Sequence, residues 1–201
     1  MQIRRSRRVG TFATLALLSG LWPGAMSAAA EHPLEIRTIA VCMDPGDDFG
    51  VIVLGRAREM ASAIFKNAGI RIKWLGWRCS DDVVRITFNA RTPYAHMPGT
   101  LAYALASTRT IVVHSERVQR TVESWQEPFL LAHVIAHEIT HLLQGEIRHS
   151  PAGVMKSQWS QRDYREMEWK RLSFTEEDIR LIHTGLDRQE QRPALAATAR
   201  Q

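Results

Sequence analysis

Residues 137–155 of this 201-residue chain read HEITHLLQGEIRHSPAGVM, and most of its recognisable chemistry lies in them. His137 and His141 stand inside the apolar run FLLAHVIAHEITHLLQ, which covers residues 129–144 and ends before Gly145. Apolar residues on nearly every side predict a buried helix over 129–144, and glycine commonly follows a helix end. Side chains four residues apart share one helix face, about 5–6 Å from each other, so both imidazoles can reach one metal ion.

Glu138 completes the pattern H-E-x-x-H. It lies about 100° round the helix from His137, where its carboxylate can accept a proton from a metal-activated water without binding the metal. Polar and charged groups inside a buried helix are costly unless they are paired or bind a metal. We therefore interpret His137, Glu138 and His141 as a site for metal-assisted hydrolysis, in preference to core side chains that hydrogen-bond to the backbone.

The residues that follow extend the pattern, because Gly145, His149 and Met155 succeed the second histidine in that order. The whole stretch resembles the metzincin clan of zinc metallopeptidases, whose signature is H-E-x-x-H-x-x-G-x-x-H followed by a Met-turn. The resemblance implies a Zn²⁺ cofactor, a peptide or protein substrate and Glu138 as general base. It also implies the metal ligands His137, His141 and His149, and a Met-turn at Met155.

The spacing departs from that signature. The clan places the glycine three residues after the second histidine and the third histidine three residues later, whereas both intervals here are four residues. The strict third-ligand position is Ile147, which cannot bind a metal. We therefore expect the helix to run one residue longer and the following loop to be one residue wider, so that His149 returns to the site.

Other residues compete for a place in the site. His133 stands four residues before His137, but three ligands from one straight helix fit tetrahedral geometry poorly, so a packed histidine is preferred. Glu166 or Glu168 would supply the third ligand of a gluzincin-type site, although their surroundings indicate an ordinary amphipathic helix. Trp159 follows the predicted Met-turn, and the metzincin resemblance places that segment at the substrate pocket. A core aromatic residue is the alternative for Trp159.

The N-terminus has the layout of a secretory signal peptide over residues 1–30. RRSRR at residues 4–8 precedes an apolar run over 11–21, and small residues up to Ala30 offer a cleavage site. The run gives about 16 Å of helix, too short for a ~30 Å hydrocarbon core. We expect export to the periplasm or the exterior, with no membrane span after cleavage. In an oxidising compartment the only two cysteines, Cys42 and Cys79, favour a disulfide over two buried thiols.

The charge distribution argues against a nucleic-acid partner. The chain has 26 Lys and Arg against 21 Asp and Glu, for a formal net charge of +5. Four of these arginines and no acidic residue lie in residues 1–30, so 22 basic residues face 21 acidic ones in the remainder. The remainder is nearly neutral and carries no basic footprint of the kind that nucleic-acid binding needs.

The pattern along the mature chain predicts one α+β domain over residues 31–186. We expect strands at 34–42, 70–75, 83–88 and 110–114, a packing helix near 49–68, the buried helix 129–144 and two polar helices at 161–172 and 175–185, followed by a disordered tail at 187–201. With the metzincin resemblance, this implies a zincin-like fold: a small twisted mixed sheet with a packing helix and a buried active-site helix.

These observations together predict an exported zinc metallopeptidase that uses a water nucleophile and Glu138 as general base. A gluzincin-type hydrolase and a non-catalytic metal-binding protein of the cell envelope are the alternatives. A site that only binds metal would not need Glu138, so its presence favours catalysis. A hydrolase or lyase that acts on something other than peptides is a third alternative.

Overall fold

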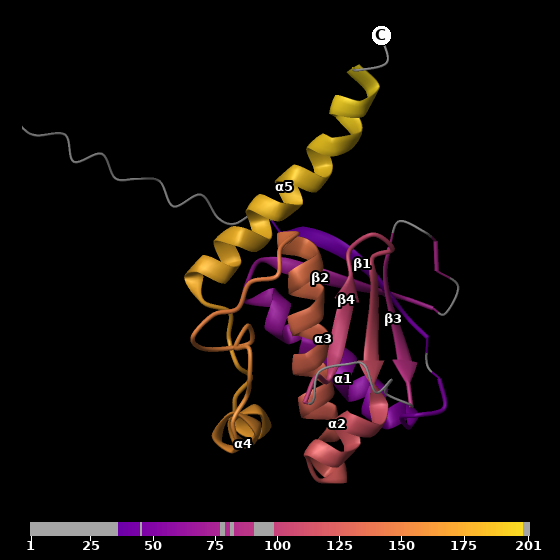
Figure 1. Cartoon of the computed structure of the whole chain (residues 1–201), viewed down its shortest axis with the longest axis vertical. Coiled ribbons are helices and arrows are strands. Elements are labelled where there is room, and N and C mark those ends of the chain that lie inside the picture. The colour runs from indigo at the N-terminus through magenta and orange to yellow at the C-terminus, as the bar shows by residue number, and fades with distance from the viewer. Residues whose placement is uncertain (1–35, 45, 77–78, 81–82, 91–98, 199–201) are drawn as a thin grey trace, which may run out of the picture. The chain divides into compact units, whose positions relative to one another are not determined.

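The computed structural model describes residues 36–44, 46–76, 79–80, 83–90 and 99–198, with side chains described up to residue 191. The predicted signal peptide of residues 1–30 lies outside this range. The described elements belong to one compact unit (Figure 1). In the described part of the chain, no helix is both long enough and apolar enough to span a membrane.

The centre of the fold is a five-stranded mixed sheet. Its strands follow the order β2-β1-β3-β5-β4 across the sheet. Neighbouring strands run parallel except β4, which pairs antiparallel with β5 at the edge. The bounds are β1 Arg37–Met43, β2 Ile70–Leu75, β3 Val84–Asn89, β4 Ala102–Leu105 and β5 Thr110–His114.

Among the described residues, five α-helices and one 3-10 turn accompany the sheet. Helix α1 carries the chain from β1 to the parallel strand β2, a connection that parallel pairing requires. Helices α1 and α3 pack against each other and against the sheet (Figure 1). The bounds are α1 Val51–Lys66, α2 Ser115–Thr121, the 3-10 turn η1 Ser124–Gln126, α3 Glu127–Gln144, α4 Gln161–Trp169 and α5 Glu176–Thr198.

The hydrophobic core lies between one face of the sheet and these two helices. In β2 the side chains alternate, with Ile70 and Ile72 buried and Arg71 and Lys73 exposed. This period of two marks a strand with one buried face. Helix α3 is instead buried over almost its whole length, as the apolar run of the sequence predicts. Its polar residues therefore sit in the core.

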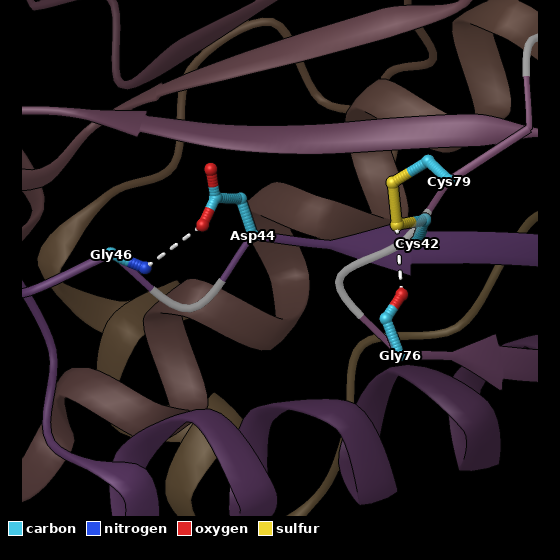
Figure 2. Close-up of a disulfide and its surroundings, with 5 residues drawn as sticks. All are labelled: Cys42, Asp44, Gly46, Gly76 and Cys79. Carbon is cyan, nitrogen blue, oxygen red and sulfur yellow. Dashed lines mark hydrogen bonds between the residues drawn. A yellow bond between two sulfur atoms is a disulfide. The ribbon is translucent and has the colours of Figure 1, made fainter.

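Cys42 and Cys79 form a disulfide, as predicted (Figure 2). Their Cα atoms lie 5.7 Å apart, within the normal range for a bridge. Cys42 is on β1, and the sulfur of Cys42 lies 3.0 Å from the carbonyl oxygen of Gly76, just beyond the end of β2. The bridge thus ties the segment after β2 back to the neighbouring strand.

The structure confirms the predicted α+β architecture, with a mixed sheet, a packing helix α1 and a buried helix α3. Three short elements were not predicted, β4, α2 and η1, because four, seven and three residues offer too little periodicity to detect. Helix α5 also differs from the prediction, since it runs to Thr198 and not into a disordered tail from residue 187.

Contacts with α3 explain why α5 continues past residue 186. Gly185 approaches the end of α3 so closely that a Cβ atom at this position would lie 2.0 Å from the carbonyl oxygen of Leu143. The side chain of Gln189 donates to the carbonyl oxygens of Leu142 and Leu143, and Arg188 donates to that of Gln144. These carbonyls have no partner within α3, so α5 caps the C-terminal end of the helix.

Candidate metal centre

Helix α3 holds the two histidines of the H-E-x-x-H pattern side by side. The ring centroids of His137 and His141 are 4.7 Å apart, and their Nε2 atoms are 3.0 Å apart. Gly145 ends the helix in the left-handed conformation, with φ at 71°, and its N–H donates to the carbonyl oxygen of His141. The helix therefore ends where the longer spacing predicts.

The chain reverses after Gly145 and brings His149 back to the same face. Its ring centroid lies 5.2 Å from that of His137 and 5.1 Å from that of His141. One nitrogen from each of the three histidines lies within 4.8 Å of the others. Ile147, at the position of the strict signature, is instead 91% exposed.

The hydrogen bonds of the helix histidines fit a metal ion. Nδ1 of His137 lies 2.9 Å from the carbonyl oxygen of Val154, and Nδ1 of His141 lies 3.3 Å from that of Glu146. A carbonyl oxygen only accepts hydrogen bonds, so each Nδ1 carries the proton and each Nε2 presents a lone pair. Two lone pairs at 3.0 Å repel each other unless a cation lies between or beside them. Such outer hydrogen bonds typically orient metal-binding histidines.

Burial sets the charge state of the site. It lowers the pKa of His137 to about 4 and also lowers the pKa of His141, so both imidazoles are neutral near pH 7 and free to bind a cation. Burial raises the pKa of the Glu138 carboxyl to about 7. A carboxyl group that titrates near neutrality is suited to accept and release protons.

The segment that carries Met155 folds back against the site. The N–H of Ser150 donates to the carbonyl oxygen of Met155, and the preceding residue, Val154, supplies the acceptor for His137. Met155 itself is fully buried in the core. A tight turn at Gly153, with φ at 75°, makes this return possible.

Trp159 lies beside the histidines and is half-buried. Its ring centroid is 5.6 Å from that of His137 and 6.3 Å from that of His133. Its indole N–H donates to the carbonyl oxygen of Gly153, which fixes the ring against the turn. Trp159 therefore forms part of the wall around the candidate metal centre.

The competing residues lie elsewhere. His133 is fully buried, with Nδ1 bonded to the carbonyl oxygen of Phe129 and Nε2 accepting the N–H of Leu172, so both nitrogens have structural partners. Glu168 accepts a hydrogen bond from Gln126. Neither Glu166 nor Glu168 belongs to the metal-binding group found among the described residues.

One further polar residue next to the site escaped the sequence analysis. Asp178 is completely buried near the start of α5 and is bonded to Arg148 and Ser150, the two neighbours of His149. In the sequence it is simply part of an acidic helix start, TEED at residues 175–178. Its place three residues after Thr175 is a local signal for a helix cap, but no local signal indicates its burial or its bonds to the loop of His149.

Comparison with known proteins found similarity among solved structures. No family model and no curated protein matches the chain. Among solved structures, it is similar to archaemetzincin from Methanopyrus kandleri, with 17% sequence identity and a TM-score of 0.47 over 75% of this chain and 96% of that one. The function is therefore inferred from the residues of the site itself.

Proposed function

We propose that this chain is a zinc-dependent metallopeptidase. The convergence of His137, His141 and His149 supports this most directly, because catalytic zinc typically takes three protein ligands and keeps one position open. Imidazole nitrogens suit zinc, and both helix histidines present Nε2 in the metal-binding form. Zinc–nitrogen bonds of ~2.0–2.1 Å need nitrogens about 3–4 Å apart. The two helix histidines meet that distance, and His149 lies within 4.8 Å of them.

Zinc bound here would supply a Lewis acid that activates water as the nucleophile and polarises the substrate carbonyl. Glu138 follows His137 on α3 and is almost fully buried. Its carboxylate accepts the proton of the attacking water and then donates it to the departing amine nitrogen, so the peptide bond breaks without a free proton or hydroxide being needed. Trp159 stands beside the metal ligands, where it contacts the bound peptide.

A metzincin-like architecture is the proposed subtype. His149 reaches the helix histidines from a loop after the glycine, and the segment of Met155 supplies the carbonyl group that orients His137. A gluzincin-type site would place a glutamate from a later helix in the third position. The position of His149 favours the metzincin-like alternative, in which Met155 marks the Met-turn.

The proposed setting is outside the cytoplasm. The disulfide between Cys42 and Cys79 fits an oxidising compartment, and the composition of residues 1–30 fits a signal peptide that is removed on export. The mature chain is nearly neutral, so its expected partner is a peptide or protein substrate and not a nucleic acid.

The decisive experiment combines metal analysis with a peptide library. We expect the purified mature protein to hold one zinc per chain and to cleave peptides. Glu138→Ala should retain zinc but lose ~10²–10⁴-fold of the hydrolysis rate. Glu59→Ala, which removes an exposed carboxylate on α1, is the matched control and should keep full activity. Zinc binding without hydrolysis of any peptide by the wild type would favour a non-catalytic metal-binding protein.

A further inference from the structure

Asp178 joins α5 to the loop that carries His149. Its carboxylate is fully buried, and its two oxygens have separate partners. Oδ2 accepts hydrogen bonds from the N–H and the hydroxyl of Thr175, at 3.0 Å and 2.7 Å, which caps the start of α5. Oδ1 accepts hydrogen bonds from another part of the chain.

The partners of Oδ1 are the two residues that flank His149. The hydroxyl of Ser150 donates to it at 2.5 Å, and the guanidinium of Arg148 donates at 3.1 Å. Arg148 also donates to the Ser150 hydroxyl at 3.3 Å, so the three side chains form a closed set. Hydrogen bonds to a buried charged group are among the stronger ones in proteins.

The loop needs such an anchor because its other residues provide little packing. Gly145, Glu146, Ile147 and His149 are all exposed, and no atom lies within 4 Å of a Cβ built at Gly145. Ser150, in contrast, is buried, and its N–H is held by the carbonyl oxygen of Met155. The bonds of Arg148 and Ser150 therefore help to hold His149 in place, in addition to the contacts of its own ring.

From this arrangement we infer that Asp178 is a positioning residue for the metal centre: it acts through Arg148 and Ser150 to hold His149 in its ligand position. The inference rests on the proposed zinc site. It assigns an influence on metal affinity, through the loop of His149, to α5, a helix without a metal ligand among the described residues. Preorganisation of the loop means that less conformational entropy is lost when the metal binds.

The test is a set of Zn²⁺ dissociation constants, measured on the full mature protein by competition with a chromophoric chelator. Asp178→Asn and Ser150→Ala should each weaken Zn²⁺ binding by ~10–100-fold, the usual effect of losing an outer partner of a ligand. Thr175→Ala is the matched control, because it removes a bond to the other carboxylate oxygen. It should lower the urea midpoint of the metal-free protein but leave Zn²⁺ affinity unchanged.

A double-mutant cycle separates positioning from general destabilisation. In a His149→Ala background, Asp178→Asn should cause no further loss of affinity, since there is no third ligand left to position. An equal loss in both backgrounds would overturn the inference. The inference would also be overturned if Asp178→Asn binds Zn²⁺ as tightly as the wild type while His149→Ala binds it more weakly. In that case the zinc site would be supported, but Asp178 would have no positioning role. If Asp178→Asn does not fold, the same double-mutant cycle can be measured with Ser150→Ala and His149→Ala.

A wild-type protein that binds no Zn²⁺ would overturn both the proposed function and this inference. The two failures are therefore distinguishable. If only the positioning role of Asp178 is wrong, the wild type still binds Zn²⁺ and His149→Ala still weakens that binding. Co²⁺ in place of Zn²⁺ gives an independent readout through its visible spectrum. Asp178→Asn should shift that spectrum toward the spectrum of His149→Ala, whereas Thr175→Ala should leave it as in the wild type.

Discussion

At the scale of single residues, the metal-binding form of His137 and His141 depends on which ring nitrogen carries the proton. Two backbone carbonyl groups, of Val154 and Glu146, fix that choice from outside the helix. The i, i+4 spacing alone would bring the rings together without deciding which nitrogens face each other. The ring orientation that suits a metal therefore depends both on the helix and on the segments that follow it.

The buried carboxyl of Glu138 should make the stability of the metal-free protein depend on pH. Burial raises its pKa in the folded state from 4.5 to about 7, so the folded protein retains this proton over a range in which the unfolded chain has lost it. The contribution of this protonated carboxyl to the free energy of unfolding is fully present below about pH 4.5 and is lost as the pH rises through 7. It amounts to at most about 3 kcal/mol.

Urea unfolding of metal-free wild type and Glu138→Gln at pH 5 and pH 8 tests this expectation. The side chain of the Glu138→Gln variant cannot titrate. From pH 5 to pH 8, the free energy of unfolding should therefore fall by more in the wild type than in this variant. The comparison cancels the contribution of the buried histidines, which both proteins share. The same pH dependence in both proteins would show that Glu138 does not titrate in this range.

The proposed third ligand, His149, gives a second prediction at the residue scale. His149→Ala should weaken Zn²⁺ binding by more than the ~10–100-fold expected for an outer partner, because it removes a direct ligand. Glu166→Ala should leave the affinity unchanged, since this carboxylate lies outside the histidine group. Isothermal titration with Zn²⁺ measures both. The reverse result, with Glu166→Ala as the weaker binder, would support a gluzincin-type site.

At the scale of elements, the turn around Gly153 is as important as the helix. A Cβ atom at Gly153 would lie 2.0 Å from the carbonyl oxygen of Ser173, and the N–H of Val154 donates to that same oxygen. The backbone at Gly153 also has a positive φ of 75°. This close approach sets the position of Val154, whose carbonyl group orients His137.

Gly153→Ala should therefore be far more disruptive than Gly145→Ala. Both glycines have positive φ, which costs an alanine roughly 1–2 kcal/mol, but the surroundings of Gly145 are open. The clash with backbone at Gly153 should add to that cost, for a total of roughly 2–4 kcal/mol. Urea midpoints of the two metal-free variants give the comparison. Equal losses would mean that the backbone around Ser173 can yield.

At the scale of the whole molecule, α5 connects parts of the chain that are remote in sequence. Arg37 of β1 forms ion pairs with Asp187 and Glu190, and His183 is bonded to the carbonyl oxygen of Ala68. The same helix caps α3 and, through Asp178, holds the loop of the candidate third ligand. The candidate metal centre is thus held in part by α5, a helix that follows its histidines by more than 25 residues.

The disulfide supplies the prediction at this scale. The bridge closes a loop between residues 37 positions apart, and loss of such a loop constraint typically costs ~2–4 kcal/mol. Cys42→Ser combined with Cys79→Ser should lower the thermal midpoint, by an amount that calorimetry records. Thiol titration of unreduced, unfolded wild type should find no free thiol. Two reactive thiols would contradict the bridge.

The sequence by itself determined the features that depend on near neighbours along the chain. Apolar residues on all sides of 129–144 predicted the buried helix, and the four-residue interval placed His137 and His141 on one face. The glycine at position 145 predicted the helix end, and the count of two cysteines predicted the bridge. Helix periodicity and helix ends are local signals, encoded by residue type and short spacing, whereas the bridge followed because only two cysteines are available to pair.

The tertiary structure alone decided which distant groups meet at the site. The carbonyl group of Val154, the buried carboxylate of Asp178 and the caps from α5 act across 17 to 47 residues of chain. In the sequence, Asp178 looks like an ordinary helix cap, and Gln189 looks like part of a polar tail. Their roles arise because burial removes water as an alternative partner, so each donor and acceptor must find the group that packing places next to it.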